Sequence, residues 1–298
     1  MDPIRSDLHT HSAHSDGTES PGELLRAARA AALDVVALTD HDTVSGWEEA
    51  RAAALDAGVG LIPGVEFSTR SGHHTYHLLG YLIDPGDSAL AAEFDRIRES
   101  RIARAQLITA HVGETTGLSW DEVRAQVHGD ATVGRPHIAD ALVARGDAPD
   151  RSTAFRTLLR PPSGMRLPEY YAPTPERALS LIRGAGGVPV LAHPGSPARG
   201  GLPTAAELEA FVRLGLLGVE IRHRENPAGA RARLAELARR HGLLITGSSD
   251  YHGTGKPNWL GENLTDAATL ARLLRLGNGT PAILPEELRE RLQAYPTA

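Results

Sequence analysis

The chain has 298 residues, enough for one large domain or two ordinary ones, and 41% of them are hydrophobic, so it can bury a sizeable core. A net charge of -6 argues against a general nucleic-acid coat, and the absence of cysteine excludes disulfides, thiol catalysis and Cys-ligated zinc. No run approaches the roughly 20 apolar residues of a membrane span, and no stretch has signal-peptide character. We therefore expect a soluble cytoplasmic protein with no membrane association and no evident stable protein partner.

Short apolar runs of strand type alternate along the chain with amphipathic helical patterns. The segment Ser20-Pro21-Gly22-Glu23 has the sequence of a helix capping box, and Gly58 and Gly242 follow predicted helix ends. Repeated strand–helix units predict parallel strands with helices outside, and seven strands favour a barrel over an open sheet. The predicted strands are Ile4–Leu8, Val35–Thr39, Gly60–Val65, Tyr76–Leu82, Val188–Ala192, Gly218–Arg222 and Leu243–Thr246.

The alternation breaks between residues 87 and 167, where the pattern is helical throughout. We therefore divide the chain into a first barrel part (1–86), a small helical insertion (87–167) and a second barrel part (168–298). Because loops and insertions on the catalytic face of a barrel often shape substrate access, we expect this role here, with a purely structural addition as the alternative. The segments predicted within the insertion are helices at Ser88–Val112, Trp120–Val127, Arg135–Arg145 and Ser152–Leu159 and a linker at Pro161–Gly164.

Nine His, Asp and Glu residues stand on or near the ends of the predicted strands. His9 and His11 are two apart, so in an extended chain both imidazoles point to the same side, and Asp250 and His252 repeat this spacing. Residues at the C-terminal ends of barrel strands face one site, where imidazole and carboxylate groups bind Zn, Mn or Fe. The set predicts a site for more than one metal ion, built from His9, His11, Asp16, His41, Glu66, His77, His193, Asp250 and His252.

The segments around these residues resemble the motifs of the PHP (polymerase and histidinol phosphatase) family of metal-dependent phosphoesterases. The resemblance covers essentially the whole chain and implies an α/β fold, a distorted seven-stranded, TIM-like (β/α)7 barrel with a trinuclear metal site. It assigns His9, His11, Glu66 and Asp250 to a first ion, Asp16, His41 and His252 to a second, and Glu66, His77 and His193 to a third, with Glu66 bridging. The matching motifs are His9-Thr10-His11, Asp16, Thr39-Asp40-His41, Glu66, His77, Ala192-His193-Pro194 and Asp250-Tyr251-His252.

Within the family, the order and spacing are most similar to stand-alone bacterial 3',5'-nucleoside bisphosphate phosphatases, some of which also trim short RNA from the 5' end. Those proteins carry a helical insertion at the same place, with motifs that resemble Arg98–Arg104 and Gly134–His137. One departure lies on the sixth strand, where the group often has a Tyr before a His and this chain has Glu220-Ile221-Arg222-His223. The substrate contacts at that strand therefore stay open.

The expected chemistry is hydrolysis of a phosphate monoester by metal-activated hydroxide. Two or three divalent ions, with Mn, Fe and Zn all suited and Mn favoured for activity, can lower the pKa of a bound water and neutralise the phosphate. We predict that Asp40 serves catalysis by orienting an imidazole or a water, and that Asp42 does the same or caps a helix. His223 is expected to bind phosphate or to protonate the leaving oxygen.

A second group of predicted site residues is cationic. Guanidinium groups suit bidentate contacts to phosphate, although an Arg-rich helix is often only a solvated face. Lys256 is the only lysine and lies in a Gly-rich loop, where its presence can also be chance. The residues predicted to bind substrate are Arg101, Arg104, Arg135, His137 and Lys256.

Three functions compete at this point. The first is hydrolysis of 3',5'-bisphosphonucleotides, with AMP or short 5'-phosphorylated RNA as further substrates. The second is a histidinol-phosphate phosphatase, which should need acidic groups for its cationic amino alcohol where this chain has arginine. The third is a non-catalytic, metal-stabilised PHP module, which the complete ligand set and the absence of a polymerase region disfavour.

Overall fold

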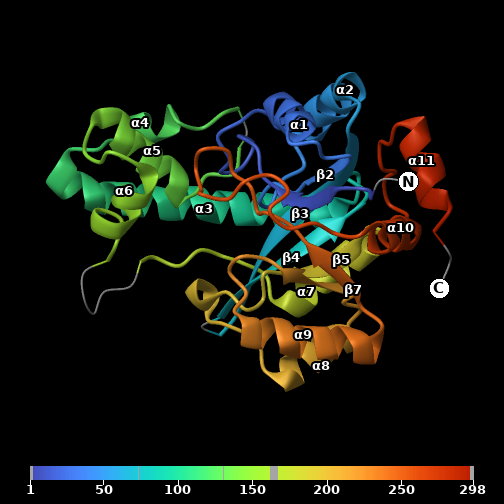
Figure 1. Cartoon of the computed structure of the whole chain (residues 1–298). Helices are drawn as coiled ribbons and strands as arrows, with labels where there is room; N and C mark the ends of the chain where they lie inside the picture. The colour runs from blue at the N-terminus through green and yellow to red at the C-terminus, as the bar shows by residue number, and fades with distance from the viewer. Residues whose placement is uncertain (1–2, 73, 130, 162–166, 296–298) are drawn as a thin grey trace.

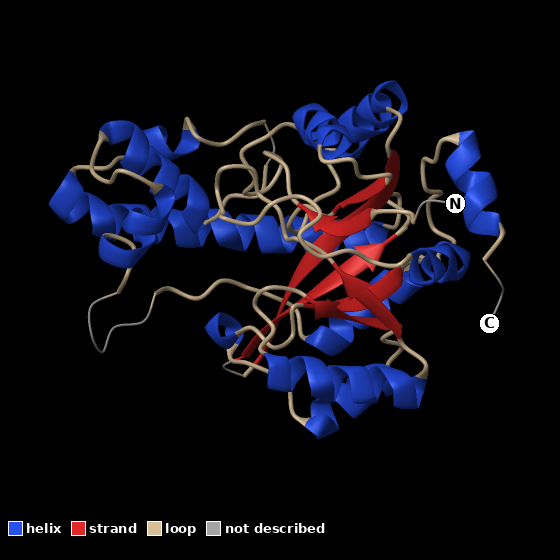
Figure 2. Ribbon diagram, in the orientation of Figure 1, coloured by secondary structure: helices blue, strands red, loops and turns tan. Residues whose placement is uncertain are grey.

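A seven-stranded sheet curls into a nearly closed barrel with helices around it (Figures 1 and 2). The computed structural model describes residues 3–72, 74–129, 131–161 and 167–295, and within them the strands follow chain order. The predicted α/β class and distorted barrel are thereby confirmed. The strands are β1 (Ser6–Thr10), β2 (Val35–Leu38), β3 (Gly60–Ser71), β4 (His74–Tyr81), β5 (Val188–Ala192), β6 (Gly218–Arg222) and β7 (Leu244–Gly247).

The repeated strand–helix pattern predicts parallel strands, but not all of the strands are parallel. β4 pairs antiparallel with both β3 and β5, while the other neighbouring strands run parallel. β3 ends at Ser71 and β4 begins at His74, so the connection is too short for a crossover helix and only a hairpin can form. β3 is also longer than predicted, and Glu66 therefore lies within this strand, opposite Leu79, instead of at its end.

The first and last strands meet without a regular ladder. Thr10 forms an isolated parallel bridge with Tyr251, and the His11 N–H donates to the Tyr251 carbonyl over 2.9 Å. This contact closes the barrel and brings the segment after β1 beside the segment after β7. The motifs His9-Thr10-His11 and Asp250-Tyr251-His252 therefore lie next to each other.

The outer helices begin and end largely where their capping residues indicate. The Ser20 hydroxyl accepts from the Glu23 N–H and the Glu23 carboxylate accepts from the Ser20 N–H, as predicted, while Gly58 and Gly242 end their helices with φ angles of 64° and 60°. No helix in the described ranges is long and apolar enough to cross a membrane. The outer helices are α1 (Pro21–Ala30), α2 (Trp47–Ala57), α7 (Pro175–Gly184), α8 (Ala205–Arg213), α9 (Ala228–His241), α10 (Ala267–Leu276) and α11 (Glu286–Gln293), with a 3-10 turn η1 at Pro197–Arg199.

A separate group of helices stands to one side of the barrel, with α3 running between the two (Figure 1). These helices bury an apolar cluster of their own, which includes Ile108, Val123, Ile138 and Leu142. The division at residues 87 and 167 stays a prediction, and most of the predicted linker lies outside the described residues. The helices are α3 (Ser88–Thr116), α4 (Trp120–Arg124), α5 (Arg135–Arg145) and α6 (Arg151–Thr157).

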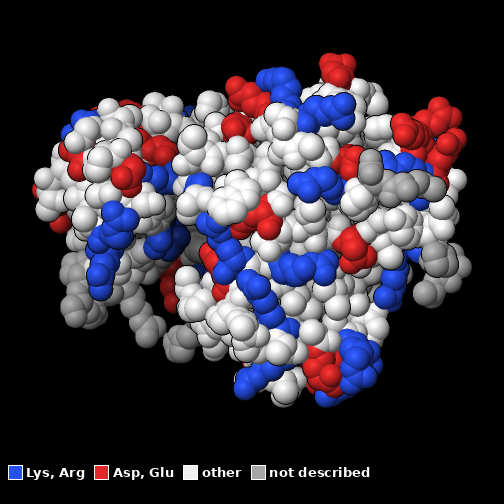
Figure 3. Space-filling view, viewed as in Figure 1, with Lys and Arg blue, Asp and Glu red and all other residues white. Residues whose placement is uncertain are grey.

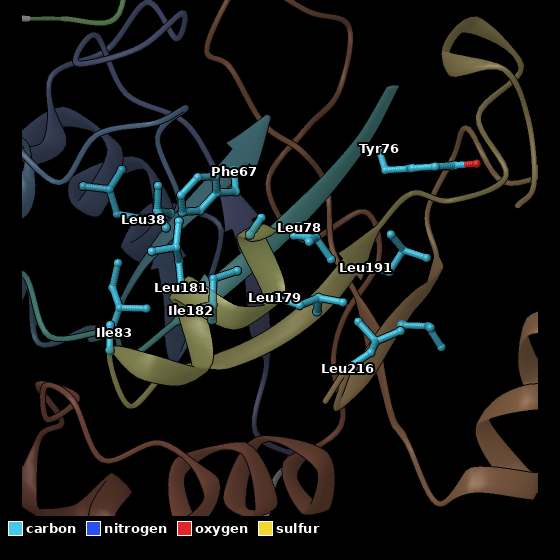
Figure 4. Packing of buried hydrophobic residues seen from close by; sticks show 14 of the residues in the cluster. Leu38, Phe67, Tyr76, Leu78, Ile83, Leu179, Leu181, Ile182, Leu191 and Leu216 are labelled. Carbon is cyan, nitrogen blue, oxygen red and sulfur yellow. The ribbon is translucent and has the colours of Figure 1, made fainter. Parts of the chain in front are cut away.

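The core of the barrel wall lies between the sheet and its outer helices. Figure 4 shows Leu179 and Ile182 of α7 beside Phe67 and Leu78 of the β3–β4 hairpin, all of them buried. Gly80 permits this approach, because a Cβ atom there would lie 3.0 Å from Ile182 Cγ1. Helix α7 thus fixes the hairpin that carries Glu66 and His77.

Candidate metal centre

The nine predicted ligands lie together in one basin at the ends and inner face of the strands. One group is formed by the two histidines around the end of β1 and two carboxylates. His9 Nε2 and His11 Nε2 are 3.1 Å apart, Glu66 Oε2 lies 3.3 and 3.2 Å from them, and Asp250 Oδ1 lies 3.6 and 3.3 Å from them. These four side chains match the first predicted ion site in composition.

A second group is centred on Asp16, whose carboxylate is 16% exposed at the edge of the basin. Its Oδ1 lies 3.0 Å from His252 Nε2 and 3.7 Å from His11 Nδ1, while Oδ2 lies 3.9 Å from His41 Nε2. The second predicted site is therefore also assembled, with His11 as an additional neighbour.

Glu66 connects these groups to a third. Its Oε1 lies 2.5 Å from His77 Nδ1 and 2.9 Å from His193 Nε2, and its Oε2 lies 3.2 Å from His41 Nδ1. One buried carboxylate thus faces all three sets of imidazoles, which is the bridging position that the resemblance implies. The roles of the nine residues as ligands stay a prediction.

Three of the histidines are oriented so that Nε2 points into the basin. His9 Nδ1 lies 3.1 Å from Glu220 Oε1, and His11 Nδ1 lies 3.3 Å from the hydroxyl of Ser15. His252 Nδ1 donates to a backbone carbonyl over 2.8 Å. Because a proton on Nδ1 leaves the Nε2 lone pair free, these tautomers suit metal coordination.

Several buried polar atoms of the basin have no hydrogen-bond partner among the described residues. They include Glu66 Oε2, Asp250 Oδ1, His41 Nδ1 and His252 Nε2. Leaving such atoms unpaired is costly, and divalent cations would satisfy them. The imidazole and carboxylate donors therefore fit several metal ions, and they suit Mn, Fe and Zn alike.

The surroundings of Glu66 and Asp250 favour the ionised form of both carboxylates. Burial opposes the ionisation of Glu66, but the imidazoles of His77 and His41 hold its pKa well below the usual range. The pKa of Asp250 is also held low despite burial, chiefly by Lys256, whose Nζ donates to Asp250 Oδ2 over 2.8 Å. Ionised carboxylates are the form that binds metal.

Glu220 is a site residue that the sequence analysis did not single out. It is fully buried in β6, where Oε1 faces His9 Nδ1 and accepts from the hydroxyl of Ser248 while Oε2 accepts from the His193 N–H over 2.8 Å. Burial opposes its ionisation, but the neighbouring His9 and His223 lower its pKa to about 2. An acid in a short strand between the apolar residues Val219 and Ile221 was the available signal.

Two aspartates hold the loops of the basin. Asp40, predicted as catalytic, accepts from the Ser12 N–H over 2.8 Å and from the Ser15 hydroxyl over 2.6 Å, and Ser15 in turn meets His11. This is an orienting contact to an imidazole through a serine. Asp7 accepts from the N–H groups of Ser249 and Gly261 over 3.0 and 2.8 Å, which fixes the loop before Asp250.

Asp42 does not cap a helix, because α2 begins after Gly46 without a side-chain cap. Its carboxylate instead accepts from the Ser68 N–H over 2.8 Å and pairs with Arg101 at 2.9 Å. Asp42, His193 and Asp250 have φ angles of 53°, 28° and 55°, a region that residues with side chains rarely adopt. Such strain persists only where the surroundings hold it, and it is common at functional sites.

The His223 ring is buried next to the Asp250 carboxylate. Its Nδ1 accepts from the Glu225 N–H over 3.2 Å, and its Nε2 lies 4.0 Å from Asp250 Oδ2 without a hydrogen-bond partner in the described chain. Burial lowers the pKa of the ring. The accepted N–H fixes the tautomer with its proton on Nε2, so the ring can donate a hydrogen bond into the basin.

A cavity of about 290 Å³ opens above the basin and joins it to the helical segment. Asp16, His41 and His77 lie on its metal side. Figure 3 shows Lys and Arg side chains around the hollow between the helical segment and the barrel. The cationic residues that line the cavity are Arg101, Arg104, Arg135, Arg199 and Lys256.

Four of the five predicted substrate-binding residues thus line this cavity, while His137 does not. The His137 ring is buried in the first turn of α5, where its Nδ1 accepts from the Gly134 N–H over 3.1 Å. Arg199 was not predicted, because nothing in its sequence context sets it apart from many other arginines. It follows β5 in the turn η1, and its Nη1 lies 2.8 Å from His77 Nε2.

Arg151 attaches the helical segment to the metal basin. Its guanidinium binds the Asp140 carboxylate through two hydrogen bonds of 2.7 and 2.6 Å and donates to the Asp16 carbonyl over 2.9 Å. The position of Asp16 therefore depends on α5 and α6 as well as on its own loop.

Comparisons with known proteins find relatives over most of the chain. The PHP domain family matches residues 7–100. The 3',5'-nucleoside bisphosphate phosphatase of Chromobacterium violaceum is 36% identical over 252 residues, which cover 84% of this chain and 88% of the relative. The 5'-3' exoribonuclease of Haemophilus influenzae is 32% identical over 260 residues, which cover 87% of this chain and 93% of the relative.

The same relationship is seen in three dimensions. The crystal structure of a candidate metal-dependent phosphoesterase from Bifidobacterium adolescentis matches with a TM-score of 0.89 and 40% identity, covering 93% of this chain and 98% of that one. With these relatives, this barrel and a His, Asp and Glu cluster suited to several metal ions, the chain belongs to the PHP family of metal-dependent phosphoesterases.

Proposed function

We propose that the chain is a phosphatase that hydrolyses 3',5'-bisphosphonucleotides. The observation that carries this proposal is the cavity in which metal-facing residues and arginines share the walls. A substrate with one phosphate has no need of both regions, whereas a bisphosphate can place one phosphate beside the metals and the other among the arginines. The bisphosphate phosphatase of Chromobacterium violaceum, similar over most of the chain, supports the same substrate class.

The metal part of the proposal follows the three groups described above. His9, His11, Glu66 and Asp250 would hold one ion, Asp16, His41 and His252 a second, and Glu66, His77 and His193 a third. Divalent ions held there supply an activated water and neutralise the oxygens of the phosphate. Lys256, paired with Asp250, adds a cation at the rim of this group.

Arg104 and Arg135 are the groups best placed for the second phosphate. Neither has a carboxylate partner within the described residues, and the Arg104 Nε–H is used by the Pro168 carbonyl. Burial and the nearby cations lower the pKa of Arg104 to about 10, although its guanidinium remains charged at neutral pH. A bound phosphate would relieve this repulsion. Arg101 is already neutralised by Asp42 and is proposed to shape the wall.

His223 is proposed as a phosphate ligand and not as a general acid. Delivering a proton from Nε2 as an imidazolium requires a second proton on Nδ1. The Glu225 N–H points at Nδ1 and would oppose that proton. The neutral ring can still donate its Nε2–H to a phosphate oxygen.

A histidinol-phosphate phosphatase is less compatible with this cavity. Its substrate carries a positively charged amino alcohol, which would meet the arginines that line the wall. Like charges at such short range raise the free energy of binding.

Initial rates on a substrate panel test the proposed function directly. With Mn-reconstituted enzyme, we expect adenosine 3',5'-bisphosphate to have a higher kcat/KM than AMP, histidinol phosphate or a 5'-phosphorylated oligoribonucleotide. Released phosphate and nucleotide products are measured for each substrate. A panel in which histidinol phosphate dominates would contradict the proposal.

Removing the arginines assigned to the second phosphate should act selectively. We expect Arg104→Ala and Arg135→Ala each to raise the KM for the bisphosphate about 10-fold or more, because a charge-assisted hydrogen bond contributes about 1.5–3 kcal/mol. The KM for AMP should change less. Arg51→Ala, which removes an ion pair with the exposed Glu48, is the matched control. Equal effects on both substrates would remove the second-phosphate role.

Replacing ligands should reduce metal content before any substrate is added. We expect His9→Ala and Asp250→Ala to retain less metal per chain than the wild type after dialysis, as measured by elemental analysis, and to lose phosphatase activity. His111→Ala provides the control, since this histidine is half-exposed on α3, where it pairs with Glu114. Unchanged metal content in both ligand variants would refute the assignment.

Glu220 should affect metal affinity through His9, the histidine that it orients. We expect Glu220→Gln to weaken metal affinity about 10- to 100-fold, as losing a carboxylate behind a ligating histidine generally does. Metal titration of the apo protein measures this, and circular dichroism checks the fold. Glu207→Gln, at the start of α8, is the control. Wild-type affinity in Glu220→Gln would show that its contact to His9 is only structural.

A further inference from the structure

A second polar cleft adjoins the proposed substrate cavity. It encloses about 320 Å³ and is lined by Arg70, Gly72 and Thr75 of the β3–β4 hairpin and by the segment 167–169. Arg104 lines this cleft as well as the cavity. A ligand group that reaches the cleft from the cavity would therefore pass the guanidinium of Arg104. We call this space the Arg70 cleft.

The charges around the Arg70 cleft are not balanced. The guanidinium carbons of Arg70, Arg101 and Arg104 lie 5.3, 4.9 and 5.1 Å from the centre of the Tyr170 ring. Arg101 is paired with the buried Asp42, but Arg104 has no carboxylate partner among the described residues. Three cations around one aromatic ring therefore leave a net positive region at the junction of the two spaces.

Among the described residues that line the cleft, the one acidic side chain, Glu169, is weakly held. Arg70 Nη1 lies 2.8 Å from Glu169 Oε2, yet the Glu169 side chain is 71% exposed while that of Arg70 is 22% exposed. Such partly exposed ion pairs contribute little to stability. A phosphate could replace Glu169 at Arg70 and would bind in the bidentate geometry that guanidinium groups favour.

We propose that the Arg70 cleft binds a further phosphoryl group that is joined to the second phosphate of the substrate, either directly or through an added nucleoside. The proposal rests on the proposed function, because it assumes that this second phosphate lies on Arg104. A group bonded to that phosphate can continue into the Arg70 cleft, because Arg104 lines both spaces. The chain would then accept substrates that are extended beyond the phosphate held by Arg104.

Two kinds of linkage share this chemistry. A phosphoanhydride places a further phosphate next to the second one, and a phosphodiester adds a whole nucleotide. In the second case the Tyr170 ring and the Thr75 side chain would lie beside the added nucleoside. In the competing interpretation, Arg70 has a structural role only and stabilises the hairpin through its ion pair with Glu169.

KM measurements on a series of nucleotides test the cleft. The reference is adenosine 3',5'-bisphosphate. The anhydride arm uses adenosine 3'-phosphate 5'-diphosphate and the isomer with the diphosphate at the 3' position. The diester arm uses the dinucleotide pApAp, which has a diester between two terminal phosphates and so tests either binding orientation.

We expect Arg70→Ala to raise the KM of at least one extended class about 10-fold more than that of the bisphosphate, which corresponds to one charge-assisted contact. Glu169→Gln should lower the KM of the same class, because it frees Arg70. The arm that responds identifies the linkage. Arg51→Ala is the control for the loss of a surface ion pair.

Other results would overturn the proposal. If Arg70→Ala changes all KM values equally, or changes none, the cleft is not a phosphoryl subsite. If Arg70→Ala fails to fold by circular dichroism, Arg70→Gln is measured instead, with the same expected ratio. If the wild type does not hydrolyse the bisphosphate, the proposed function fails. Calorimetric titration of wild type and Arg70→Gln with the extended nucleotides then still decides whether the cleft binds them.

Discussion

The shared carboxylate of Glu66 is the contact on which the rest of the site depends. Its two oxygens face His9, His11, His41, His77 and His193, so that side chains from four strands and the segments after them meet at one group. This position exists because β3 continues past the point where its parallel neighbour ends and turns into an antiparallel hairpin. The irregularity that distorts the barrel therefore also places the bridging ligand at its centre.

A second set of buried carboxylates surrounds the predicted ligands and binds backbone groups. Asp7, Asp40, Asp42 and Glu220 each accept backbone N–H groups and hold a loop or a strained residue in place. A buried carboxylate is unfavourable without such partners. The strained backbone at His193 is accordingly held by Glu220. These hydrogen bonds fix the loops around the basin, which favours metal binding because less ordering remains to be done.

Much of the fold and the basin could be predicted because the relevant signals are local. The capping box at Ser20 and the bounds of α5 depend on neighbouring residues, and the paired spacing of His9 and His11 depends only on strand geometry. The hairpin was missed because the predicted third strand stops at Val65, whereas β3 continues to Ser71. Glu220 and Arg199 could not be predicted from local signals. Their roles arise from contacts between distant segments, such as Glu220 with His9, which no spacing along the chain reveals.

The closure of the barrel between Thr10 and Tyr251 has a consequence for biosynthesis. His9 and His11 leave the ribosome before β2 to β7, whereas Asp250 and His252 follow β7. The first metal group needs Asp250 and the second needs His252, so neither group can be completed during most of translation, and both residues must find partners far away in sequence. Contacts of such long range form slowly, because the entropy of closing the chain must be overcome first. Completion of these groups is thus a late event in folding, and a truncated nascent chain would hold His9, His11 and Glu66 without Asp250.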